Sequence, residues 1–160
     1  MFYRLLSRFV ESLVILLAGF IVTMVTAEVT LRYLFGHSLI FTEELSRYLM
    51  VWIVFLSSAL AIRDGSHIHI RILVNRLGPR LQKIVQLGAH ALIITFLVLV
   101  TVEGLKILPR QLQQMCITLD ISLFYFYLAI PVGCILMIVF LLPVIKNSWA
   151  EKSPAGNEKE

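Results

Sequence analysis

The chain has 160 residues, of which 59% are hydrophobic and only 15% are charged. An ordinary soluble domain carries about 45–50% apolar and about 25% charged residues, so this composition excludes one. The net charge of +4 does not indicate nucleic acid as a partner, because lysine and arginine in a membrane protein set its orientation in the bilayer.

Long apolar runs predict four membrane-spanning helices, at about residues 9–31, 43–63, 84–108 and 121–145. A bilayer core ~30 Å thick is crossed by about 20 helical residues. The second run is too short alone, but Thr42 is suited to cap an extended helix whose first turn holds Glu43 and Glu44. The first run is longer than the ~7–15 apolar residues of a signal peptide, so we expect it to be retained.

Prolines and charges predict how the second half of the chain is divided. Pro109 should end the third helix, and Asp120 should cap the fourth. Pro131 should kink the fourth span, because a proline inside a helix lacks the N–H of its hydrogen bond. Residues 1–150 then form a single membrane domain, followed by a charged tail, 151–160, that we expect to be disordered.

Lysine and arginine are divided unevenly between the two sides of a four-span protein. Four lie in the connections between the first and second and between the third and fourth spans: Arg32, Arg47, Lys106 and Arg110. The other ten lie on the opposite side: Arg4, Arg8, Arg63, Arg71, Arg76, Arg80, Lys83, Lys146, Lys152 and Lys159. Because the side richer in these residues is the cytoplasmic one, both termini are predicted to be cytoplasmic.

The connection between the second and third spans predicts a helix that lies on the membrane surface. It follows Arg63 and covers residues 66–77, where His67, Arg71 and Arg76 are mixed with apolar residues. At helical spacing the apolar residues form a stripe opposite a basic face, which suits contact with lipid headgroups. The alternation also fits a strand, but an isolated strand would leave its backbone unpaired.

Few residues carry the chemistry of a catalytic or cofactor site. His90 is the only ionisable side chain clearly within the hydrocarbon. A neutral, hydrogen-bonded histidine is favoured over a haem ligand, because a haem would need a second histidine within the membrane. Glu11 lies too near the start of its span for the central carboxylate of a small exporter. His67 and His69 lack the further ligands of a metal site. We expect no enzyme and no cofactor in this chain, with an electron-transfer subunit or a homo-oligomeric exporter as alternatives.

Charged residues gather where the first span ends and the second begins. Glu28 and Arg32 are four residues apart, and Arg47 follows Glu43 and Glu44 by four and three residues. Such spacing places opposite charges together on one helix face. Because the link between the spans is short, we expect the two sets to meet. They would form an ion-pair group that holds the hairpin, a docking site for a partner protein, or both.

The stretch from Leu31 to Leu73 resembles the small membrane subunit of tripartite ATP-independent periplasmic (TRAP) transporters. The matching elements are Arg32-Tyr33, Gly36, Glu43-Glu44-Leu45, Arg47, Trp52, Arg63, Gly65, His67 and Ile68, and later Ala129–Gly133, which resembles an Ile-Pro-x-Gly segment of the family. Two positions depart from the family pattern: Arg71 stands where an acidic residue is frequent, and Phe41 where a tryptophan is frequent.

The resemblance implies a non-catalytic subunit of a sodium-driven importer of organic acids, such as dicarboxylates or sialic acid, in a bacterial inner membrane. It implies that a large membrane subunit holds the substrate and sodium sites. This chain would enlarge the static scaffold of that subunit and help to receive a periplasmic substrate-binding protein. Lipids are the other expected partners, and the identity of the substrate is not encoded here.

Overall fold

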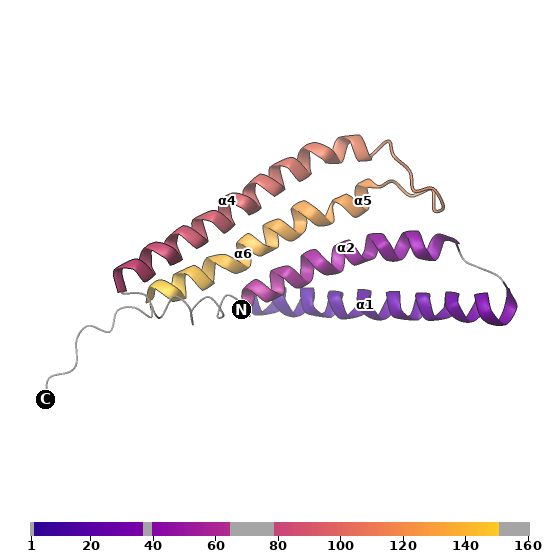
Figure 1. The fold of residues 1–160 in the computed structure, drawn as a ribbon, viewed down its shortest axis with the longest axis horizontal. Coiled ribbons are helices and arrows are strands. Elements are labelled where there is room, and N and C mark those ends of the chain that lie inside the picture. The colour runs from indigo at the N-terminus through magenta and orange to yellow at the C-terminus, as the bar shows by residue number, and fades with distance from the viewer. Residues whose placement is uncertain (1, 37–39, 65–78, 151–160) are drawn as a thin grey trace, which may run out of the picture.

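The computed structural model of the protein describes residues 2–36, 40–64 and 79–150. The helices are α1 (Phe2–Phe35), α2 (Ile40–Arg63), α4 (Pro79–Gln111), the single turn α5 (Phe124–Tyr127) and α6 (Ala129–Ala150), as Figure 1 shows. Four segments are long and apolar enough to cross a membrane: Tyr3–Phe35, Phe41–Arg63, Leu87–Gln111 and Phe124–Ile145. The prediction of an all-helical, four-span membrane protein is confirmed. The predicted surface helix at 66–77 and the tail lie outside the described residues.

The four long helices form an open row and not a closed bundle. Within the described residues α2 packs against α1 and α6, and α6 packs against α4, whereas α1 and α4 make no extensive contact (Figure 1). A closed four-helix bundle surrounds one core with all four helices. In the row, 39% of the α6 span is buried against only 6% of the α1 span, so α6 holds the row together and the outer helices stay largely exposed.

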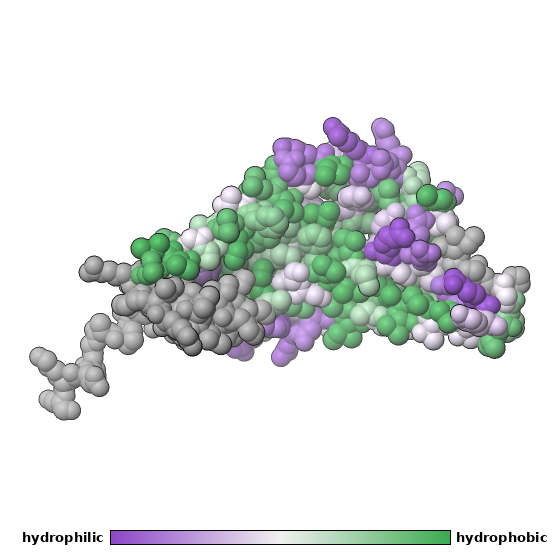
Figure 2. Space-filling view, in the orientation of Figure 1, coloured by the Kyte–Doolittle hydropathy of each residue, from purple (hydrophilic) through white to green (hydrophobic). Residues whose placement is uncertain are grey.

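One end of the row, called here the loop end, is where α1 ends, α2 begins and residues 112–123 join α4 to α5. Figure 2 shows that hydrophobic residues cover the middle of the visible face, while hydrophilic residues gather toward the loop end. This division of the surface matches what a bilayer demands, with an apolar belt in the hydrocarbon and polar groups near its boundary.

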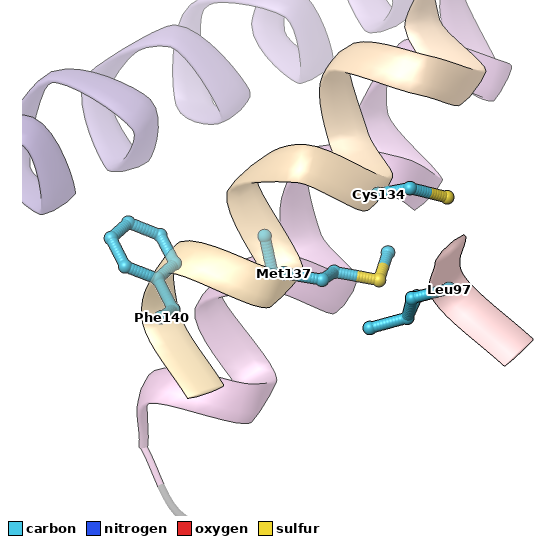
Figure 3. Packing of buried hydrophobic residues seen from close by; sticks show 5 residues of the cluster. Leu97, Cys134, Met137 and Phe140 are labelled. Carbon is cyan, nitrogen blue, oxygen red and sulfur yellow. The ribbon is translucent and has the colours of Figure 1, made fainter. Parts of the chain in front are cut away.

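The core of the row lies where α6 meets its two neighbours. Its buried residues are Ala59 of α2, Leu97 of α4, and Cys134, Met137 and Phe140 of α6, most of which Figure 3 labels. At Gly133, a Cβ atom would lie 2.5 Å from the Cβ of Phe55, which is closer than real Cβ atoms approach. Glycine is therefore the residue that lets α2 and α6 pack this tightly.

Two expectations about helix starts are wrong. Thr42 does not cap α2, because the helix begins at Ile40 and Thr42 is fully buried in its first turn. Asp120 does not cap the last span, because the following helix α5 begins only at Phe124. Asp120 has a φ of +48° instead, a left-handed conformation that aspartate tolerates better than most residues and that suits a turn.

One of the two prolines differs from the expectation, and the other lies one turn after an interruption of its helix. Pro109 does not end α4, which continues to Gln111, because a proline this close to the C-terminus removes only one hydrogen bond. Pro131 lies in the first turn of α6, and the helical path is divided at Leu128, between α5 and α6. A proline clashes with the carbonyl four residues earlier, here that of Tyr127, so the discontinuity precedes the proline by about one turn.

The close approach at Gly133 predicts an asymmetric response to added side chains. Gly133→Leu forces Phe55 or α2 to move, and we expect it to destabilise the folded row by about 1–3 kcal/mol. Gly19→Leu, on the open surface of α1 with nothing within 4 Å, is the matched control and should leave the melting temperature in detergent unchanged or raised. Equal losses of melting temperature in both variants would contradict the packing described here.

Candidate functional site

The connection between α4 and α5 is an ordered hairpin at the loop end. Met115 and Ser122 pair as an antiparallel bridge. Further hydrogen bonds close the base of the hairpin: Cys116 N to Ile121 O at 2.9 Å, Leu123 N to Gln114 O at 2.9 Å, and Ser122 Oγ to Gln111 O at 3.0 Å. The segment is therefore a built structure outside the spans, and we call residues 115–122 the outer hairpin.

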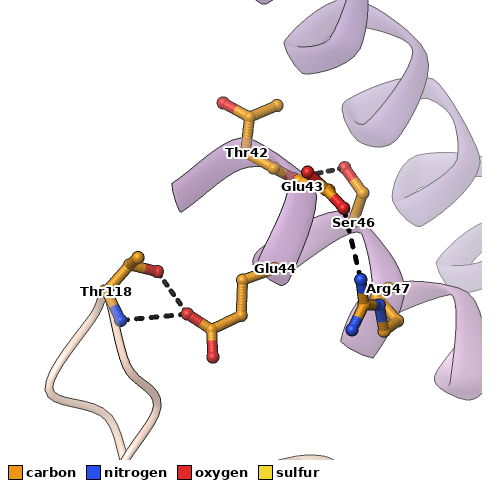
Figure 4. Close-up of polar contacts among 6 residues, drawn as sticks. All are labelled: Thr42, Glu43, Glu44, Ser46, Arg47 and Thr118. Atoms are coloured by element: carbon orange, nitrogen blue, oxygen red, sulfur yellow. Dashed lines mark hydrogen bonds and ion pairs between the residues drawn. The ribbon is translucent and has the colours of Figure 1, made fainter. Parts of the chain in front are cut away.

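Glu44 fastens the outer hairpin to α2. Its carboxylate accepts hydrogen bonds from the backbone N–H groups of Ile117, at 3.1 Å, and Thr118, at 3.0 Å, and also from the Thr118 hydroxyl (Figure 4). Hydrogen bonds to a charged acceptor are stronger than neutral ones. The expectation that Glu44 joins the charged group around Arg47 is therefore replaced, because its carboxylate is directed to a segment more than 70 residues later in the chain.

A stripe on α2 continues this attachment along the helix. Tyr48 stacks on Phe126 of α5, with ring centroids 4.5 Å apart, and Trp52 Nε1 donates a hydrogen bond to the carbonyl of Tyr125 at 3.3 Å. Glu44, Tyr48 and Trp52 are spaced four residues apart, which places them on one helix face. Tyr48 was not among the predicted residues, although its spacing from Glu44 and Trp52 is a signal that could have found it.

Two ion pairs at the loop end each join residues four apart on one helix. Arg32 Nη2 lies 2.5 Å from Glu28 Oε1 on α1, and Arg47 Nη2 lies 3.3 Å from Glu43 Oε1 on α2. These local pairs agree with the spacing in the sequence, and the meeting of the two charged sets across the link stays a prediction. The Glu43 and Arg47 side chains are 82% and 72% exposed, so their attraction is screened by solvent and adds little to the stability of the hairpin.

The outer hairpin has an exposed apolar tip and a buried interior. Ile117 is 94% exposed and Met115 is 60% exposed, whereas the Cys116 side chain between them is buried. Burial raises the pKa of the Cys116 thiol, and the nearby negative charge of Glu44 raises it further. A buried thiol that is kept protonated in this way is a poor nucleophile, which agrees with a packing role for Cys116.

Arg63 links helices at the opposite end of the row. As the last residue of α2, it places Nη1 3.6 Å from Glu11 Oε2 of α1 and Nε 2.7 Å from Asp64 Oδ1. Glu11, considered from the sequence as a pump carboxylate, is thus engaged in a structural ion pair. His90 is half-buried on α4. His67, Arg71 and Arg76 lie outside the described residues.

The described part of the chain contains no group of three or more histidine, cysteine, aspartate or glutamate side chains able to hold a metal ion. Its recognisable polar structure is concentrated at the two ends of the row, in Glu44 with the outer hairpin and in Arg63 with Glu11. This arrangement favours surfaces for contact with other molecules over a reaction centre.

The attachment by Glu44 predicts a specific loosening of the outer hairpin. In Glu44→Gln the carboxylate charge and one acceptor oxygen are lost, so amide hydrogen exchange at Ile117 and Thr118 should become several-fold faster. Glu43→Gln, one residue earlier and exposed to solvent, is the control and should leave this exchange unchanged. Unaltered exchange in Glu44→Gln would show that the bridge and base hydrogen bonds hold the hairpin without it.

Comparison with known proteins identifies a family that this chain matches. Residues 21–151 match the family described as "Tripartite ATP-independent periplasmic transporters, DctQ component". A putative TRAP transporter small permease protein of Haemophilus influenzae is 36% identical over 74 residues, which cover 46% of this chain and about half (46%) of that protein. The sialic acid TRAP transporter small permease protein SiaQ of Vibrio cholerae is 23% identical over 147 residues, covering 92% of this chain and 85% of that protein.

A longer relative contains a similar segment. The isethionate TRAP transporter permease protein DctMQ of Oleidesulfovibrio alaskensis is 31% identical over 105 residues, covering 64% of this chain but only 16% of that protein. Because the family match extends from within α1 to the end of α6, it includes all four spans at least in part. The chain therefore belongs to the DctQ component family of tripartite ATP-independent periplasmic transporters, a family of transporter subunits and not of enzymes.

Proposed function

We propose that this protein is the non-catalytic small subunit of a sodium-driven importer of organic acids in the bacterial inner membrane, and that it pairs with a large membrane subunit. The observation that carries the proposal is the open row of four apolar helices, in a chain whose family consists of transporter components. Relatives are named for sialic acid, isethionate and C4-dicarboxylates, all of them organic acids, and this chain's substrate class is proposed to be the same.

The exposed faces of the row support pairing with a large subunit. A protein that moved substrate by itself would need polar or charged groups along a path through the membrane, and such groups in the hydrocarbon are costly. The charged side chains of α1 and α2 lie near the two ends, with Glu11 and Glu28 bounding a long uncharged stretch of α1. The row is suited to be a fixed wall beside another chain, which would hold the substrate and sodium sites.

The longer permease relative supports this pairing. In DctMQ the segment similar to this chain makes up only 16% of the protein, so the similar helices belong to one chain with a much larger permease part. A fusion of this kind is readily explained when the two parts already lie side by side. In the present protein we assign the larger part to a separate chain.

The orientation of the row follows from its charges. Arg4, Arg8 and Arg63 lie at the end opposite the loop end, and they belong to the side of the chain that is richer in lysine and arginine. We therefore propose that both termini are cytoplasmic and that the loop end faces the periplasm. The outer hairpin is then exposed to the soluble substrate-binding protein of the system.

The tip of the outer hairpin is the proposed contact for that binding protein. Ile117 and Met115 present an apolar surface beyond the spans, and Glu44 holds them in one conformation before any partner arrives. A preorganised contact surface loses less conformational entropy on binding. The exposed Glu43–Arg47 pair supplies polar groups at the same end, where a rim of an interface would lie.

The docking role predicts a defect in uptake without a defect in assembly. Ile117→Asp places a charge on the apolar tip, so the concentration of binding protein needed for half-maximal uptake should rise about tenfold, the effect of a modest interface hot spot. Uptake is measured in proteoliposomes that contain this chain and its large subunit, with a sodium gradient applied.

Gln113→Asp is the matched control, because it adds the same charge at an exposed polar position just before the hairpin. Both variants should co-purify with the large subunit as the wild type does. If Ile117→Asp requires no more binding protein than Gln113→Asp, the tip is not the docking contact. If the wild-type chain fails to co-purify with the large subunit, the pairing itself is wrong.

A further inference from the structure

The first turns of α1 contain a hollow that the transporter role does not use. It measures about 530 Å³, is wide open to the surroundings, and its described lining residues are Leu5, Leu6, Arg8, Phe9 and Ser12. Leu5, Phe9 and Ser12 are spaced as i, i+4 and i+7, so they follow one face of the helix. Leu5 is 71% exposed and Phe9 is 66% exposed. Arg8, between them in the sequence, is also exposed. The hollow thus combines apolar walls with one cation.

Arg8 has no acidic side chain engaged with it in the described part of the chain. The ion pairs there involve Arg32, Arg47, Arg63 and Lys106. The carboxylate nearest to Arg8 in sequence is that of Glu11, three residues later, and its Oε2 lies 3.6 Å from Arg63 of α2. Among the described residues, the positive charge of Arg8 is therefore available to an anionic group of a bound molecule.

Ser12 adds a second polar group deeper along the same face. Other hydroxyl residues of α1, such as Thr23 and Thr26, donate to the carbonyl four residues earlier, and no such bond is formed by Ser12 in the described structure. Ser12 lies one turn beyond Arg8, about 6 Å further along the helix axis. A ligand in the hollow would contact the guanidinium group of Arg8 and, one turn further along, the hydroxyl group of Ser12. Apolar side chains would surround both contacts.

We propose that this hollow binds an anionic phospholipid. The phosphate and anionic headgroup would pair with Arg8, an ester carbonyl would accept a hydrogen bond from Ser12, and an acyl chain would cover Leu5, Leu6 and Phe9. The position agrees with this order of groups, because the first turns of a membrane-spanning helix lie at the headgroup layer, where basic residues attract anionic lipids. A helix of another protein would fit less well, since it would have to neutralise Arg8 at the lipid boundary.

The proposal is tested on the full-length chain purified in mild detergent. Phosphatidylglycerol and phosphatidylcholine with identical acyl chains are titrated separately, and bound lipid is counted by native mass spectrometry while the melting temperature is followed. We expect the wild type to retain one phosphatidylglycerol at a concentration at least several-fold below that needed for phosphatidylcholine. The bound phosphatidylglycerol should raise the melting temperature.

Arg8→Gln should remove the preference for phosphatidylglycerol, because glutamine lacks the charge that selects the headgroup. Arg4→Gln is the matched control, since Arg4 lies one turn earlier on the same helix and does not line the hollow. Ser12→Leu fills the space near the acyl chain and should weaken binding of both lipids.

Three outcomes would overturn the proposal. The wild type could show no preference between the two lipids, or Arg4→Gln could lose it as fully as Arg8→Gln does. In the third, Arg8→Gln would leave lipid binding intact and abolish co-purification with the large subunit, which would make this face a protein contact. The lipid measurement itself needs no partner subunit, so its failure leaves the proposed transporter role untouched.

Discussion

The structure depends on the close contact between α2 and α6. Gly133 allows the two helices to approach until Phe55 lies against the α6 backbone, and the buried side chains of Ala59, Cys134 and Phe140 fill the space on either side. α6 then holds α4 on its other side, while α1 packs mainly on α2 and touches α6 where Tyr3 meets Phe140. This contact is the most extensive connection between the α1–α2 hairpin and the α4–α6 pair, and the contacts of Glu44 and Tyr48 with the outer hairpin and α5 add to it.

The same contact explains the form of the loop end. The path of the last span is divided at Leu128, which allows the short helix α5 to lie against α2 through Tyr48 and Phe126. The outer hairpin that precedes α5 is thereby brought within reach of Glu44. Hydrogen bonds at both the base and the tip of the outer hairpin then hold it against α2.

Hydropathy and length were sufficient to predict the four spans, because the bilayer imposes the same requirement on every crossing. Helix ends were predicted less well, since Thr42 and Pro109 act through packing and neighbouring turns and not through their own propensities. The hydrogen bond between Glu44 and Thr118 joins residues 74 positions apart, and no local sequence pattern predicts such a contact. The sequence placed Gly133 only within a family segment. Its tight packing against Phe55 could not be predicted, because that contact exists only in the assembled helices.

In the function that we propose, these four helices form a fixed wall and another chain moves the substrate. Uptake of a radiolabelled organic acid into proteoliposomes tests it most directly, with a sodium gradient and the binding protein present in every sample. We expect no uptake with this chain alone and robust uptake when the large subunit is added. Sodium-driven uptake by this chain alone would contradict it.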